Sequence, residues 1–149
     1  MADMVTDTTL DHLRKLDTTF AAVSSAPSPK VVAVRAARGW RFPWYSSFDS
    51  DFNYDFHVSF DSATAPPNYN YRDAEDMAAT KDEWMLDYAG DREGISCFLR
   101  EGDEIFHTYS TYGRGVEVMM PALHLLDLTA LGRQEEWEEP KGRVLLTER

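Results

Sequence analysis

Four side chains that could carry acid–base or ion-binding chemistry are Asp51, His57, His107 and Arg114. A carboxylate and two imidazoles can exchange protons near neutral pH, and a guanidinium can hold an anion. Together they would suit a non-redox enzyme, but only if the fold brings all four into one cleft, because proton transfer needs contact at hydrogen-bond distance. Their spacing along the chain matches no known catalytic pattern, so we assign no catalytic residue.

Metal binding is a second chemistry to consider, with His57 beside Asp51 and Asp55, or with His107, as ligands. A strong metal-binding sequence places its ligands at a fixed interval, as in His-Glu-x-x-His, and no such interval occurs here. A half-buried strand histidine is the simpler interpretation of His107. We therefore predict no metal and no cofactor.

An aromatic stretch from residue 39 to residue 60 contains two Trp, two Tyr and five Phe. Each such ring buries roughly 150–250 Å² when it packs, so the stretch is either part of the core or the wall of a ligand site. Core packing is the commoner use of such residues. If the stretch is the wall of a ligand site, a few polar groups must complete the pocket. The candidate pocket residues are Trp40, Trp44, Ser46, Ser47, Asp51, Asn53, His107, Tyr109 and Arg114.

Two of these candidates have simpler alternatives. Ser46 and Ser47 are not part of a Gly-x-Ser-x-Gly sequence, so a serine nucleophile is not indicated. Arg114 lies between Gly113 and Gly115, where the backbone could approach an anion closely at a helix start. A surface ion pair in an acidic protein explains Arg114 equally well, and both interpretations stay open.

Composition limits the class of protein. The chain has 149 residues, a formal net charge of -11 and one cysteine, Cys97. This length suits one domain covering residues 1–149, and the acidity argues against nucleic acid or an anionic membrane surface as partner. Without an apolar leader or spanning run, and without a pair of cysteines to oxidise, we expect a cytoplasmic protein. Cys97 is expected to be a buried apolar filler on a strand.

The first third of the chain predicts a helix, a strand and a second helix. Thr6 and Asp7 can cap a helix that runs to Leu16. Residues 18–24 are β-prone and mostly apolar, as in a strand covered on both faces. Ser28 and Pro29 stand at the cap and first position of a helix that Gly39 ends. In residues 52–60 both strand and helix spacings occur, and only the family resemblance described below favours a short helix.

The remainder predicts a β-hairpin and a helix. Residues 95–100 and 104–109 flank Glu101-Gly102-Asp103, which is typical of a hairpin. After Gly115 the apolar spacing is helical, but Pro121 requires a kink or a new start. Residues 61–93 form an inserted region, a loop followed by a helix over 73–87. Residues 136–149 are interpreted as a C-terminal tail.

Longer segments of the sequence resemble a known family. Residues such as Gly39-Trp40-Arg41-Phe42-Pro43-Trp44 and Phe106-His107-Thr108-Tyr109 are similar to a bacterial thioredoxin-like family, domain of unknown function 899, which is predicted to contain dithiol-disulfide oxidoreductases. The resemblance rests on residues 25–27, 39–47, 50–56, 106–115 and 126–135.

The resemblance implies an α/β fold, a thioredoxin-like sandwich ending in a β-hairpin plus helix, in which the first central strand and the Cys-x-x-Cys sequence are missing. A dithiol couple needs two thiols, and Cys97 is alone. We therefore expect a non-catalytic binding or oligomeric module, with the gap closed by a rearranged pairing or by a second copy of the chain. A small ligand or a protein partner would bind its aromatic surface. The alternative is a fragment or short form of an oxidoreductase whose redox cysteines lie upstream of Met1.

Overall fold

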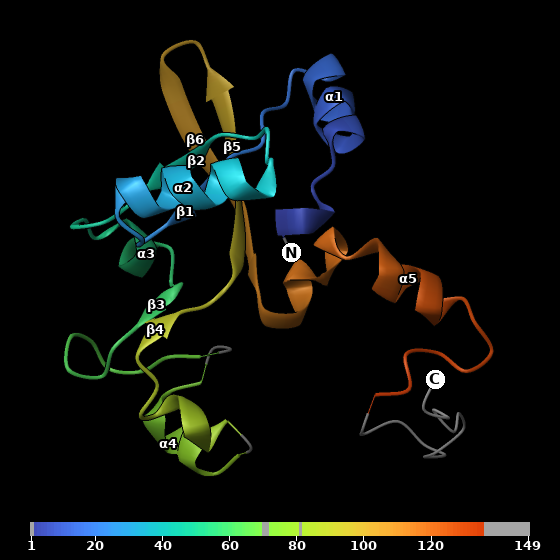
Figure 1. Ribbon diagram of the computed structural model, residues 1–149. Coiled ribbons are helices and arrows are strands. Elements are labelled where there is room, and N and C mark those ends of the chain that lie inside the picture. Colours follow the sequence, from blue (N-terminus) through green and yellow to red (C-terminus); the bar gives the residue numbers. More distant parts are fainter. Residues whose placement is uncertain (1, 70–71, 81, 136–149) are drawn as a thin grey trace.

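The computed structural model describes residues 2–69, 72–80 and 82–135. Within these ranges the chain forms three separate two-stranded sheets with short helices around them (Figure 1). Mixed helix and strand content confirms the α/β class. The parallel sheet pairs β1 (Ala22–Ser24) with β2 (Trp44–Ser46), and the two antiparallel sheets pair β3 (Ser59–Phe60) with β4 (Gly90–Asp91) and β5 (Gly94–Glu101) with β6 (Glu104–Tyr112).

The N-terminal elements are a 3₁₀ turn, η1 (Ala2–Met4), and the helix α1 (Asp7–Lys15). Thr6 is the N-cap, and its side chain accepts a hydrogen bond from Thr9 N at 3.2 Å, which satisfies one of the free donors of the first turn. Leu10 is the buried residue of this helix. The predicted helix is confirmed.

The parallel sheet is a β–α–β unit whose connection contains α2 (Ser28–Arg38). Gly39, at φ 67°, ends the helix in the left-handed conformation that glycine adopts without strain, as predicted. The cap is Pro27 and not Ser28, because the helix begins one residue earlier than expected. Only the last part of the predicted strand over 18–24 pairs, since its partner β2 is three residues long.

The predicted short helix in the aromatic stretch is confirmed as α3 (Phe52–Asp55).

The inserted region that follows, residues 61–93, contains little regular structure. The single helix predicted over 73–87 is wrong: the structure has α4 (Ala74–Ala78), capped by Asp73, and a separate 3₁₀ turn, η2 (Glu83–Met85). Thr80 donates its hydroxyl to Met77 O at 3.1 Å, a local bond that competes with a continued helix.

The hairpin β5–β6 is confirmed, with Gly102 at φ 61° in its turn and an irregularity between Cys97 and Phe98. After it come a 3₁₀ segment, η3 (Gly113–Met119), and the helix α5 (Pro121–Asp127). The helix thus starts afresh at Pro121, where the missing N–H costs no hydrogen bond. The tail predicted at residues 136–149 lies outside the described residues.

The main core lies where η1, α1 and the β1–α2–β2 unit meet. Val5, Leu10 and Phe42 are buried there, and Trp40 and Trp44 pack against them. Core packing is therefore confirmed for one part of the aromatic stretch. The prediction of core packing is wrong for Tyr45 and Phe48, which are 59% and 61% exposed. Among the described residues, no helix combines the length and the apolar character that crossing a membrane requires.

The long hairpin and the parallel sheet each keep an open edge. Within the described residues β1 pairs only with β2, and β5 pairs only with β6. The hairpin carries several large exposed apolar side chains. These are Phe98 (49%), Leu99 (49%), Ile105 (70%), Phe106 (44%) and Tyr109 (57%).

Candidate functional site

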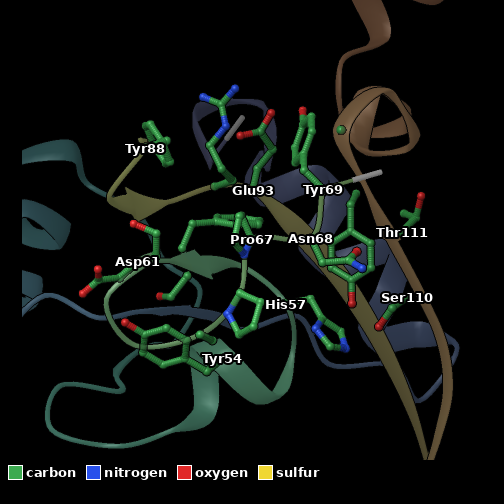
Figure 2. Close-up of a pocket in the computed structure, with 18 of the residues that line it drawn as sticks. Tyr54, His57, Asp61, Pro67, Asn68, Tyr69, Tyr88, Glu93, Ser110 and Thr111 are labelled. Atoms are coloured by element: carbon green, nitrogen blue, oxygen red, sulfur yellow. The ribbon is translucent and has the colours of Figure 1, made fainter. Parts of the chain in front are cut away.

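A cavity of about 870 Å³ lies between the inserted region and the end of the hairpin (Figure 2). Three stretches of chain form its walls: residues 54–69, residues 88–93 and residues 109–113. In Figure 2, Asp61 lies on one side of the cavity, and Ser110 and Thr111 from β6 lie on the opposite side. Its volume is in the range of small-molecule sites.

Short-range contacts hold the three walls together. The two-residue ladder of β3 and β4 is extended by a hydrogen bond from Arg92 N to Val58 O at 2.7 Å. At Gly94 the first residue of β5 passes so close that an added Cβ would lie 2.7 Å from Val58 Cγ1. Any larger residue there would force the Val58 side chain to shift. The cavity wall is therefore preformed by backbone pairing.

A polar network centred on Asp91 supports the cavity from behind. The Asp91 carboxylate accepts hydrogen bonds from the hydroxyls of Ser25 and Ser59 and from Asn53 Nδ2, the last at 3.2 Å. Asn53 Oδ1 in turn accepts the Ser47 hydroxyl at 2.7 Å, and both of these residues are buried. One carboxylate thus connects the end of β1, α3, β3 and β4.

The ionisation of Asp91 follows from this network. Burial alone would raise the pKa of the Asp91 carboxyl, because it removes the charged form from water. The hydrogen bonds from Ser25, Ser59 and Asn53 favour the charged form and outweigh burial, so the net pKa is lowered. The carboxylate is ionised at neutral pH, and its role here is to fix neighbouring elements.

Four aromatic rings adjoin the cavity in a closed cycle. Phe60 lies 6.0 Å from Tyr69 and 6.4 Å from Tyr88, and Trp84 lies 6.1 Å and 5.7 Å from the same two rings, all edge to face. The Arg92 guanidinium lies over the Trp84 ring at 4.8 Å and over the Tyr88 ring at 5.4 Å. These distances are within the range of cation–π contacts.

His57 is the lining residue with an unusual backbone. It follows α3 at φ 53°, the left-handed position that often ends a helix and is usually taken by glycine. A non-glycine residue costs some free energy at such a position, although histidine tolerates it better than most residues. Its ring is held at the cavity by a rigid turn, in which Val58 N donates to Asn53 O at 2.9 Å.

The family model for bacterial proteins of unknown function, DUF899, matches residues 1–146. The chain belongs to the DUF899 family. Neither the curated proteins nor the solved structures include a match. The description of this family names no activity.

The pocket residues predicted from the sequence are distributed over several places in this DUF899 chain. Trp40 and Trp44 pack against the core, and Ser46 donates its hydroxyl to Ala26 O at 2.7 Å. Ser47 and Asn53 belong to the Asp91 network. These residues stabilise the fold around the cavity and do not line it.

Of the other predicted pocket residues, one lines the cavity and the rest lie elsewhere. Tyr109 lines the cavity, whereas His107 packs against Phe98 with 5.3 Å between the ring centroids and contacts Ser110 Oγ through Nε2 at 2.8 Å. Asp51 precedes α3 without capping it through its side chain. Arg114 pairs with Glu117 and Glu135, and the hydrogen bonds to Glu135 raise its pKa.

Of the four acid–base candidates, only His57 lines the cavity of the DUF899 protein, so the structure does not bring Asp51, His107 and Arg114 to it. Within the part of the chain that the structure describes, no three His, Cys, Asp or Glu side chains are grouped to hold a metal ion. The expectation for Cys97 is wrong: it is exposed.

Several cavity residues were not singled out from the sequence: Asp61, Tyr69, Tyr88, Arg92 and Glu93. The signal that could have found them is the set of aromatic residues that interrupt the acidic inserted region, Tyr69, Trp84 and Tyr88. Rings in irregular chain usually pack on each other, which favours a local cluster.

Proposed function

We propose that this DUF899 protein is a thioredoxin-like binding module without a dithiol of its own, and that it works as a homodimer. The element order supports the thioredoxin-like part: a β–α–β unit, a hairpin and then a helix. The single cysteine in the sequence supports the non-redox part, because dithiol exchange needs a second thiol to resolve the mixed disulfide.

The observation that carries the dimer is the open edge of β5 together with the exposed apolar residues of the hairpin. An unpaired strand edge presents free N–H and C=O groups that pair readily with another strand. With apolar residues beside the edge, a second hairpin would gain both backbone hydrogen bonds and buried area. Exposed edges of this kind are usually covered in folded proteins.

Charge opposes this assembly and provides a test. Two copies at net charge -11 repel each other, and salt screens that repulsion over about 10 Å at 0.1 M. The dimer is therefore expected to strengthen as salt is raised. Sedimentation or light scattering should give twice 17.0 kDa at 0.3 M salt. A monodisperse monomer at every salt and protein concentration would overturn the proposal.

A matched pair of variants tests the hairpin itself. Ile105→Lys replaces a 70% exposed residue of β6 and should shift the mass to that of a monomer, because lysine blocks apolar packing beside a strand edge. Val32→Lys makes the same change at a 65% exposed position of α2 and should leave the dimer intact. Loss of the dimer in both variants would mean that the hairpin does not form the interface, since each change lowers the repulsion between copies.

The non-redox part has its own assay. Reduction of insulin disulfides or of peroxide by the purified protein should be no faster than background. Robust turnover that survives Cys97→Ser would contradict the proposal. The oxidoreductase alternative is tested by reading the DNA upstream of Met1 in frame, since a strand-like apolar run ending in Cys-x-x-Cys would favour it.

A further inference from the structure

We propose that the cavity between β3, β4 and the end of β6 binds an organic cation, in which an ammonium group is attached to an apolar body. The cavity is formed by one chain, so this inference goes beyond the proposed dimer and does not depend on it. Three properties of the walls support it: aromatic rings, carboxylates and the size of the space.

The rings provide the main attraction. Six aromatic residues line the cavity, and the negative face of each ring attracts a cation. Tyr and Phe rings from three different stretches surround the space, so a bound ammonium group could contact more than one face at once. They are Tyr54, Phe60, Tyr69, Tyr88, Tyr109 and Tyr112.

Arg92 shows that these rings accept a cation. Its guanidinium lies over Tyr88, which lines the cavity, and over Trp84, which does not. Arg92 itself lines the cavity, so its guanidinium occupies part of the ring surface there. The rings of Tyr54, Tyr109 and Tyr112 remain for a ligand.

Two carboxylates add to the attraction. Asp61 is fixed by hydrogen bonds from Ala63 N at 2.9 Å and Thr64 Oγ1 at 3.1 Å. Glu93 is exposed at the cavity and forms no ion pair among residues 2–69, 72–80 and 82–135. With two acidic residues against Arg92, and a net charge of -11 on the whole chain, the local and the long-range fields both favour a positive ligand.

The volume indicates the size of the ligand. A space of about 870 Å³ is near the upper end of the usual range for small-molecule sites. A bare ammonium ion would leave most of it filled with water. An apolar group beside the charge would contact Pro66, Pro67 and the ring faces, which adds buried apolar area.

Titration calorimetry with paired probes tests the charge requirement. Choline and 3,3-dimethylbutan-1-ol have the same shape, but only choline is charged. Choline should bind about 10-fold more tightly, and benzyltrimethylammonium more tightly still because of its ring. Equal affinity of the two isosteres, tighter binding of benzoate, or no binding of any cation up to millimolar concentration would overturn the proposal.

Variants locate the binding. Glu93→Gln should weaken choline binding severalfold, whereas Glu101→Gln on β5 removes the same charge away from the cavity and should have no effect. Tyr109→Leu should weaken binding of benzyltrimethylammonium, with Tyr45→Leu as the control, because the two tyrosines are 57% and 59% exposed and only Tyr109 lines the cavity. If a cavity variant and its control lost the same affinity for the cation, the ligand would not bind in this cavity.

The same measurements separate this inference from the proposed function. Ile105→Lys, which is expected to give a monomer, should keep its affinity for benzyltrimethylammonium, since Ile105 does not line the cavity. Loss of cation binding with loss of the dimer would contradict the site within one chain. A wild-type monomer that binds cations would overturn the dimer and leave the cavity proposal supported.

Discussion

Replacing Phe42 by alanine is expected to lower the free energy of unfolding by about 3–5 kcal/mol. The Phe42 ring has no exposed surface, and it contacts Phe20 edge to face at 5.2 Å and Trp40 at 5.4 Å. Alanine would leave a cavity that the surrounding rings fill only in part, because aromatic side chains have few rotamers. The described core cluster has three buried members, so little packing remains to compensate.

Urea unfolding followed by tryptophan fluorescence measures this loss. The matched control is Phe48→Ala, which removes the same side chain from a position that is 61% exposed and should change the free energy of unfolding by less than about 1 kcal/mol. Natural domains are stable by about 5–15 kcal/mol, so the Phe42 variant should unfold at much lower urea. Similar losses for both variants would mean that Phe42 is not the centre of the core.

The elements that the sequence predicts well are those with a local cause. Thr6 caps α1 through its own hydroxyl, Gly39 takes the positive φ that ends α2, and Pro121 starts α5. Each of these effects depends on residues within one turn of the chain, so no distant contact can easily override it.

The long-range pairing was harder to predict. The pattern of residues 18–24 indicates a strand covered on both faces, but a sequence does not state how long its partner will be, and β2 provides only three residues. Exposure of Cys97 was mispredicted for the same reason. An apolar strand pattern implies that something covers the strand, but the Phe56 ring packs on the neighbouring Phe98 and leaves Cys97 exposed.

The candidate site illustrates the same limit. Trp40, Trp44 and Tyr109 all belong to aromatic segments, yet two of them pack on the core and one lines the cavity. Tyr109 faces the cavity because residues 54–69 and 88–93 form its other walls, and the hydrogen bonds of Asp91 join these two stretches. A single acidic residue in a Gly90-Asp91 dipeptide gives no sign of this from the sequence.

Asp91→Asn is expected to lower the free energy of unfolding by about 1–2 kcal/mol at pH 7, because hydrogen bonds to a charged acceptor are stronger than those to a neutral one. One Asp91 oxygen accepts from both Ser25 Oγ and Asn53 Nδ2, and the other accepts from Ser59 Oγ. The side-chain NH₂ of an asparagine is itself a hydrogen-bond donor, so it would face one of these three donors instead of accepting from it. The expected loss of unfolding free energy is at the low end of the range for hydrogen bonds to charged groups, because the carboxylate is partly exposed to water.

The pH dependence gives the sharper test. The pKa of Asp91 is lower in the folded protein than in the unfolded chain, where it is near 3.9. Its contribution is therefore complete above about pH 4–5 and is lost as the pH falls through the folded-state pKa. The difference between wild type and Asp91→Asn in urea unfolding should be constant from pH 8 to pH 5 and should shrink below about pH 4.

Asp103→Asn is the control for this measurement. The Asp103 side chain is fully exposed and its pair with Arg100 is 4.0 Å long, so the change should be nearly neutral at every pH. Many other carboxylates titrate in the same interval, and only the difference between variants isolates Asp91. A difference that stayed constant down to pH 2.5 would mean that Asp91 acts through shape and not through its charge, and the network would then not be what orders the cavity walls.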